Sequence, residues 1–172
     1  MKKILKTLID YSLFEKYDKD YFINNKILPL FENDISIKMA VCKNSKLETI
    51  KNDFNKVISF LEIDELELLF MISHIDQKTL LYSMALKAIS QNSFEKYVDK
   101  FLQELLSFSI NLRASDIHIE QYKDVILFKF RIDGRLKTFF AFKSEFFKLI
   151  SSYIKLISNL DITQIRIPQD GR

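Results

Sequence analysis

The sequence predicts an α+β fold made of two small domains, each a short sheet packed with helices. Three observations favour this class. In several segments apolar residues recur at steps of three and four, as they do in amphipathic helices. Residues 113–142 instead alternate polar with apolar residues or gather β-branched and aromatic ones, as strands do. The 172 residues have room for one ordinary domain or two small ones, and a hydrophobic fraction of 48% is ample for packed cores.

The first half of the chain predicts a mixture of elements after short N-terminal helices. Residues 28–31 and 35–41 predict two extended segments. Apolar residues at steps of three and four over residues 47–61 predict an amphipathic helix, whereas the short apolar run 66–72 suits a buried strand. A helix to about Ile89 then follows. We therefore expect the order strand, strand, helix, strand, helix.

A domain boundary is predicted at residues 90–93. These residues, Ser-Gln-Asn-Ser, are four small polar residues between two helical patterns, which is a linker signal. The predicted domains are therefore 1–89 and 94–172. The second begins with a helix, whose apolar stripe extends to about Leu106.

The most informative strand follows that helix. Ile117 and Ile119 alternate with three polar residues, Asp116, His118 and Glu120. Because side chains in a strand alternate between faces, the apolar pair lies on one face and the polar trio on the other. A metal site could be imagined on that trio, but a solvated or interface-facing polar stripe is the favoured interpretation, and no metal is predicted.

A hairpin is predicted directly afterwards. Residues 125–132 are mostly β-branched and aromatic and end at Asp133-Gly134, a strong turn signal, and residues 136–142 continue the hairpin. A plain two-residue turn would place Arg135 opposite Ile132 and mix polar with apolar residues on one face. The register therefore stays open at this point. A last amphipathic helix follows the hairpin.

Composition excludes several classes of protein. Lys and Arg number 26 against 23 Asp and Glu, and these charges are spread along the chain, so no nucleic-acid surface is expected. The lone Cys42 excludes an internal disulfide and, with only two histidines, makes a Cys/His zinc site unavailable. No run of about 18 apolar residues is present. We expect a cytoplasmic protein without a membrane span.

Three motifs in order resemble those of one family. They are ASDIHIEQ at 114–121, FKFRIDG at 128–134 and LDITQIRIPQDGR at 160–172. They resemble the second N-terminal domain of the secretion ATPases that power type II secretion, type IV pilus assembly and competence pseudopili, whose members carry close variants of ASDIHIEP, RFRIDG and LDIAERRxPQDGR. The element order of residues 1–89 is similar to the family's first N-terminal domain. The resemblance therefore implies that residues 1–89 are a first N-terminal domain that docks a partner. It implies that residues 94–172 are a second N-terminal domain that is incomplete at its C-terminus. In that family the P-loop ATPase domain comes later in the chain.

The resemblance implies the non-catalytic N-terminal portion of such an ATPase. The only glycines, Gly134 and Gly171, start no GxxxxGK(S/T) phosphate loop, so the chain alone would not hydrolyse ATP by the family's mechanism. No cofactor is expected on this chain; ATP and Mg belong to the full-length parent, a hexamer. The expected partners are inner-membrane platform or adaptor proteins and the chain's own C-terminal ATPase domain, with no nucleic acid. The expected location is cytoplasmic, peripheral at the inner membrane.

Four basic residues are the candidate site. They are Lys129, Arg131, Arg135 and Arg172. The resemblance implies that they lie where the second N-terminal domain approaches nucleotide held by the ATPase domain, and an arginine given to a phosphate stabilises the charge of phosphoryl transfer. Lys129 replaces the first arginine of the family's RFR, which keeps the charge and loses the bidentate geometry. A solvated basic strand edge or ordinary ion pairs are the alternative interpretation. No catalytic residue is predicted.

Two alternatives to the motor portion stay open. One is a free-standing adaptor or regulatory module without an ATPase, and the other is a nucleic-acid-binding protein of DNA uptake, which would need a clustered basic face. Gly171-Arg172 predicts a turn and the start of a further strand, so we expect a portion of a longer protein. The motifs are shared by machines that secrete protein, build pili or import DNA, and do not choose among them.

Overall fold

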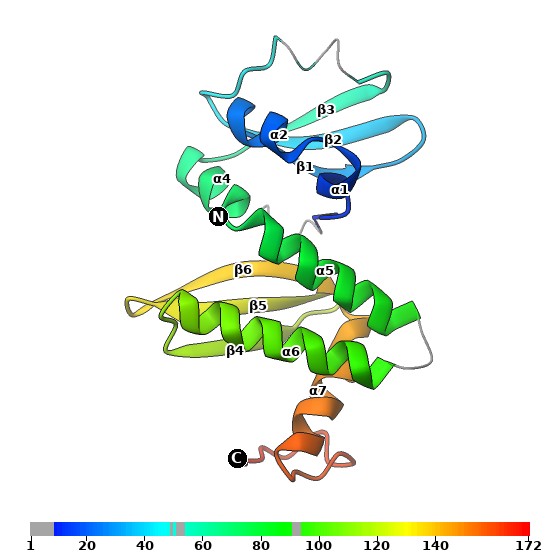
Figure 1. Ribbon diagram of the computed structural model, residues 1–172, viewed down its shortest axis with the longest axis vertical. Coiled ribbons are helices and arrows are strands. Elements are labelled where there is room, and N and C mark those ends of the chain that lie inside the picture. Colours follow the sequence, from blue (N-terminus) through cyan, green and yellow to red (C-terminus); the bar gives the residue numbers. More distant parts are fainter. Residues whose placement is uncertain (1–8, 49, 51–53, 91–93) are drawn as a thin grey trace. The chain divides into compact units, whose positions relative to one another are not determined.

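A computed structural model describes residues 9–48, 50, 54–90 and 94–172. These residues form six helices and two three-stranded sheets (Figure 1). The predicted α+β class is therefore confirmed. Within the described part of the chain, no helix is both long and apolar enough to span a membrane.

The chain divides into two compact units. The N-terminal unit comprises residues 1–82 with Phe139–Ala141, and the C-terminal unit comprises residues 83–138 with 142–172. The predicted linker at 90–93 stays a prediction, because residues 91–93 lie outside the described residues.

The N-terminal unit contains a mixed sheet in the order β1-β2-β3. The elements in chain order are α1 (Leu13–Lys16), α2 (Lys19–Asn25), β1 (Ile27–Glu32), β2 (Ser36–Val41), β3 (Val57–Glu62), α4 (Glu65–Ile72) and the first half of α5 (Ile75–Ser90), which continues into the C-terminal unit. β1 pairs antiparallel with β2, and β2 pairs parallel with β3. The two predicted extended segments are therefore confirmed as β1 and β2.

Two local expectations for this unit are wrong. Within the predicted helix over residues 47–61, residues 57–61 are strand instead, because residues 57–62 pair with β2 as β3. Residues 49 and 51–53 of that prediction lie outside the described residues. The predicted strand over residues 66–72 is the helix α4. Its start is capped by the Asp64 side chain, which accepts hydrogen bonds from the backbone N–H groups of Leu66 and Glu67. Among the described residues from Ile27 to Ser90, the elements in order are thus strand, strand, strand, helix, helix.

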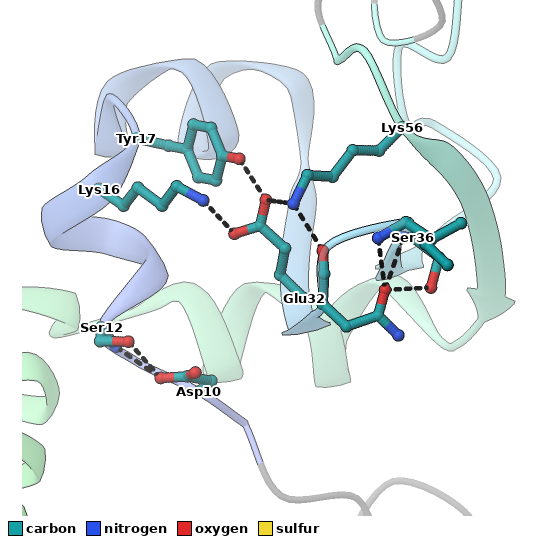
Figure 2. Close-up of polar contacts among 9 residues, drawn as sticks. Asp10, Ser12, Lys16, Tyr17, Glu32, Ser36 and Lys56 are labelled. Carbon is teal, nitrogen blue, oxygen red and sulfur yellow. Dashed lines mark hydrogen bonds and ion pairs between the residues drawn. The ribbon is translucent and has the colours of Figure 1, made fainter.

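A buried carboxylate ties α1 and β1 to the residue before β3. Glu32 has a side chain only 6% exposed, and it accepts from Lys16 Nζ at 2.7 Å, Lys56 Nζ at 2.8 Å and the Tyr17 hydroxyl at 2.5 Å (Figure 2). Burial alone would raise the pKa of Glu32, but these three donors outweigh it and lower the pKa to about 2. Three segments distant in sequence therefore converge on one side chain.

Glu32→Gln is expected to destabilise the N-terminal unit by about 2 to 3 kcal/mol at pH 7. The folded pKa lies below the usual value of 4.5, so this stabilisation is present above pH 4.5 and is lost as pH falls toward 2. Urea unfolding of both proteins from pH 7 down to pH 2 measures the difference, which should shrink with acid. Glu15→Gln, at an exposed position of α1, is the control. A pH-independent difference would contradict the ion-pair account.

The C-terminal unit follows the predicted pattern. The elements from residue 94 onward are α6 (Phe94–Asn111), β4 (Asp116–Gln121), β5 (Val125–Ile132), β6 (Arg135–Lys143) and α7 (Glu145–Ile157), with strand order β4-β5-β6. All belong to this unit except Phe139–Ala141 of β6. Asp133 and Gly134 have φ of 50° and 73°, the left-handed pair that a two-residue type I′ turn requires. The hairpin signal in the sequence is therefore confirmed.

One face of the second sheet packs on α6, which runs along it (Figure 1). The β4–β5 register pairs Ile117 with Phe130 and Ile119 with Phe128. The rings of Phe128 and Phe130 lie 5.5 and 6.1 Å from rings of α6. Since strand side chains alternate, the polar residues of β4 and β5 face the other way.

The segment after α7 folds on itself and forms no strand among its described residues. The Gln169 side chain accepts from the Asp161 N–H at 2.8 Å and donates to the Asp161 carbonyl at 2.9 Å. A Cβ at Gly171 would lie 2.6 Å from the Ser158 carbonyl oxygen, so this close approach requires glycine. The strand expected to start at Gly171-Arg172 is not formed within these residues.

Candidate functional site

Two of the four predicted site residues lie side by side on β5, and acidic residues lie opposite them. The register places Asp116 opposite Arg131 and His118 opposite Lys129. The charged face is the set of five side chains on this surface of the sheet: Asp116, His118, Glu120, Lys129 and Arg131. The hairpin and the strand alternation together build it, because each member is separated from the next on its strand by one apolar residue.

Arg131 meets its partners through one edge of the guanidinium group. Its Nε donates to Asp116 Oδ2 at 3.0 Å and to Oδ1 at 3.3 Å. Its Nη2 lies 3.3 Å from His118 Nε2. Within the part of the chain that is described, neither Nη atom donates a hydrogen bond to a carboxylate.

Asp116 is held from two further sides. The Ser115 hydroxyl donates to Oδ2 at 2.6 Å, and His118 Nε2 lies 2.5 Å from Oδ1. An ionised carboxylate only accepts, so His118 Nε2 must carry the proton and donate it to Asp116. It then cannot accept from Arg131. These contacts, led by the Ser115 hydroxyl and followed by His118 and Arg131, lower the pKa of Asp116.

Lys129 has a carboxylate partner of its own. Its Nζ contacts Glu120 Oε2 at 2.5 Å, and the Tyr122 hydroxyl donates to the same oxygen at 2.9 Å. The Lys129 side chain is only 17% exposed. The contact with Glu120 raises the pKa of Lys129, and the contact with Lys129 lowers the pKa of Glu120. Both groups are therefore charged at neutral pH.

The other two predicted residues belong to different segments. Arg135 is exposed at the start of β6, and Arg172 is exposed in the segment after α7. In the described ranges neither takes part in an ion pair, in contrast to Lys129 and Arg131. The geometry thus brings together one lysine and one arginine of the predicted four.

The acidic partners are what the sequence reasoning missed. Asp116, His118 and Glu120 were placed on one face, but not opposite the basic residues of the next strand. The sequence contains a signal for this pairing. Alternation along β5 puts Lys129 and Arg131 on one face, and antiparallel pairing with β4 places the polar residues of β4 on that same face. Across the described residues no group of three or more His, Cys, Asp or Glu side chains is arranged to hold a metal.

Comparison with known proteins finds a family match for the C-terminal part of the chain, which contains the charged face. Residues 90–172 match the family described as type II/IV secretion system protein. Residues 90–172 are therefore similar to a region of that secretion family. The resemblance seen in the three motifs is thereby confirmed.

Relatives of the chain carry names from the same machines. It is 41% identical over 73 residues to the type II secretion system protein E of Aeromonas hydrophila, which is 42% of this chain and 15% of that protein. It is 38% identical over 73 residues to the type II secretion system ATPase E of Vibrio cholerae, 42% of this chain and 14% of that protein. It is 33% identical over 78 residues to the type IV pilus assembly ATPase PilB of Acinetobacter baylyi, 45% of this chain and 14% of that protein.

The matched region is short relative to these proteins. The chain spans about 15% of the length of the curated relatives it matches. The region that matches the secretion family is therefore a small part of each relative.

Proposed function

We propose that the chain is the non-catalytic N-terminal portion of a secretion or pilus-assembly ATPase, and that its charged face contacts the phosphates of nucleotide bound by the ATPase domain. The observation that carries the proposal is that Lys129 and Arg131 lie on the same face of β5, within the region that matches the secretion family. ATP and Mg would be held by the ATPase domain. Contact from this face would link its position to the nucleotide state.

The chemistry of the two side chains supports a phosphate contact. Arg131 keeps its Nη1–Nη2 edge off the carboxylates, and that edge matches two oxygens of a phosphate group. Lys129 adds an ammonium, a compact charge with further donors beyond the one given to Glu120. A polyphosphate is a ligand that satisfies both.

The N-terminal unit would serve as the docking part of the protein. In this proposal it binds inner-membrane platform or adaptor proteins, placing a cytoplasmic hexamer at the inner membrane. Support comes from the relatives, which are named as components of secretion and pilus machines. Cosedimentation of the chain with inner-membrane vesicles from cells that contain the machine, compared with cells that lack it, tests this part. Equal binding to both would contradict it.

Arg131→Ala is expected to lower ATP hydrolysis by about tenfold to a hundredfold when the chain is joined to its ATPase domain. The first step is to sequence the reading frame beyond Arg172 for a GxxxxGK(S/T) motif. Steady-state hydrolysis of the longer protein then compares Arg131→Ala with Lys123→Ala, which removes a positive charge from the exposed turn before β5. Equal rates for the two variants would contradict the nucleotide contact. A reading frame without the motif would favour the free-standing adaptor.

A further inference from the structure

The Arg131 guanidinium offers two edges that can each bind two oxygens. One edge runs through Nε and a neighbouring Nη, and the other through Nη1 and Nη2. Asp116 takes the Nε position, at 3.0 Å to Oδ2 and 3.3 Å to Oδ1. This side-on contact fixes the plane of the guanidinium group and leaves its terminal edge without a carboxylate.

Asp116 is fixed more firmly than an isolated surface carboxylate. Ser115 donates to one of its oxygens, at 2.6 Å, and His118 contacts the other at 2.5 Å. Because His118 gives its Nε2 proton to Asp116, its ring does not accept from Arg131 Nη2, which lies 3.3 Å away. The Nη2 hydrogen on the Nη1 side is directed to the terminal edge. The strand register places Asp116 directly opposite Arg131, so this arrangement does not depend on a flexible loop.

We propose that Asp116 is a positioning residue that holds Arg131 side-on, so that the Nη1–Nη2 edge is presented to a phosphate. The inference rests on the proposed function, since a nucleotide gives that edge its ligand. Ser115 and His118 act through Asp116 by fixing its two oxygens. Glu120 is a useful contrast, because it pairs with the Lys129 ammonium, a point charge that has no edge to orient.

The test measures orientation and binding separately on the 172-residue chain. Nuclear magnetic resonance of the arginine Nε–H groups reports hydrogen exchange at Arg131, and titration with inorganic triphosphate reports phosphate affinity at Lys129 and Arg131. The variants are Asp116→Ala, which removes the acceptor, and Asp116→Asn, which keeps an oxygen that can accept from Nε. Asp124→Ala, at an exposed turn position, is the control for lost negative charge.

In Asp116→Ala we expect Arg131 Nε–H exchange at least tenfold faster and triphosphate binding about fivefold to tenfold weaker. Asp116→Asn should stay within about twofold of the unsubstituted chain in affinity, and Asp124→Ala should not weaken binding. A simple charge effect predicts the opposite sign, because removing a carboxylate should strengthen binding of an anion. This difference in sign separates positioning from electrostatics.

Two failures are distinguishable. If triphosphate shifts neither the Lys129 nor the Arg131 signals in the unsubstituted chain, the phosphate contact of the proposed function is overturned, and the inference with it. If triphosphate binds but Asp116→Ala leaves affinity and Nε–H exchange unchanged, only the positioning role is overturned. If Asp116→Ala disturbs the β4–β5 amide signals, Asp116→Asn decides: a fivefold loss of affinity with slow Nε–H exchange retained would contradict the proposal.

Discussion

Phe101→Ala is expected to lower the free energy of unfolding of the C-terminal unit by about 3 to 5 kcal/mol. Phe101 is fully buried on α6, and its ring lies 5.5 Å from Phe128, 5.8 Å from Phe142 and 4.8 Å from Phe146. These three rings come from β5, β6 and α7. Truncation would leave a cavity that all three elements share, and backbone adjustment of one element cannot fill it.

The measurement must assign the loss to the right unit. Urea unfolding gives the total, and hydrogen exchange of the β5 amides reports the C-terminal unit alone. Leu106→Ala is the matched control, because Leu106 lies on the same helix but is 46% exposed. It should cost less than about 1 kcal/mol. Similar losses for the two variants would mean that the Phe101 cluster does not hold the unit together.

Lys78→Met is expected to stabilise the N-terminal unit by about 1 to 4 kcal/mol at pH 7. Lys78 is 1% exposed, and its Nζ donates to the carbonyls of Phe70 at 3.1 Å and Met71 at 3.0 Å, at the end of α4. Its Nζ also lies 4.4 Å from the centroid of the Phe139 ring. Burial lowers the pKa of Lys78 to about 7, because these contacts do not replace full hydration of the ammonium.

The lowered pKa of Lys78 determines how the free energy of unfolding changes with pH. The folded pKa lies below the usual 10.5, so between pH 7 and 10.5 the unfolded chain binds more protons and stability rises with pH. The pKa of His74 is also lowered, first by burial and then by the charge of Lys78. This shift adds a further increase of stability with pH, at lower pH values. Burial raises the pKa of Tyr11 and Tyr82, so stability falls again above about pH 10.

Unfolding measured at several pH values from 7 to 10 checks the expectation. The unsubstituted chain should gain stability across this window, and Lys78→Met should lack that gain. Lys87→Met, at an exposed position of the same helix, should keep the gain. Parallel curves for the unsubstituted chain and Lys78→Met would show that Lys78 keeps its proton in the folded state.

The second sheet could be predicted from sequence because its signals are local. Ile117 and Ile119 set the strand period, and Asp133-Gly134 fixes the turn, so the elements from α6 to α7 follow without knowledge of their partners. The charged face was predicted only in part. Which carboxylate meets Arg131 depends on the pairing of β4 with β5, and on rotamers that no periodicity encodes.

The elements of the N-terminal sheet could not be predicted from periodicity alone. Short apolar runs suit helix and strand equally, and tertiary pairing decides between them. Residues 57–62 become β3 because β2 supplies a parallel partner. Residues 65–72 become α4 because Asp64, which directly precedes the run, caps the start of the helix. The burial of Lys78 was equally unpredictable, since a lysine in the first turn of a helix usually lies in water.

β5 serves the core with Phe128 and Phe130 and the charged face with Lys129 and Arg131, in strict alternation. Over evolutionary time such a strand tolerates substitutions but not changes of length. One inserted or deleted residue would send the phenylalanines to the solvent side and the cations into the core for the rest of the strand. Length variation among related proteins should therefore collect in the turns that flank β5, while the span from Val125 to Ile132 stays constant.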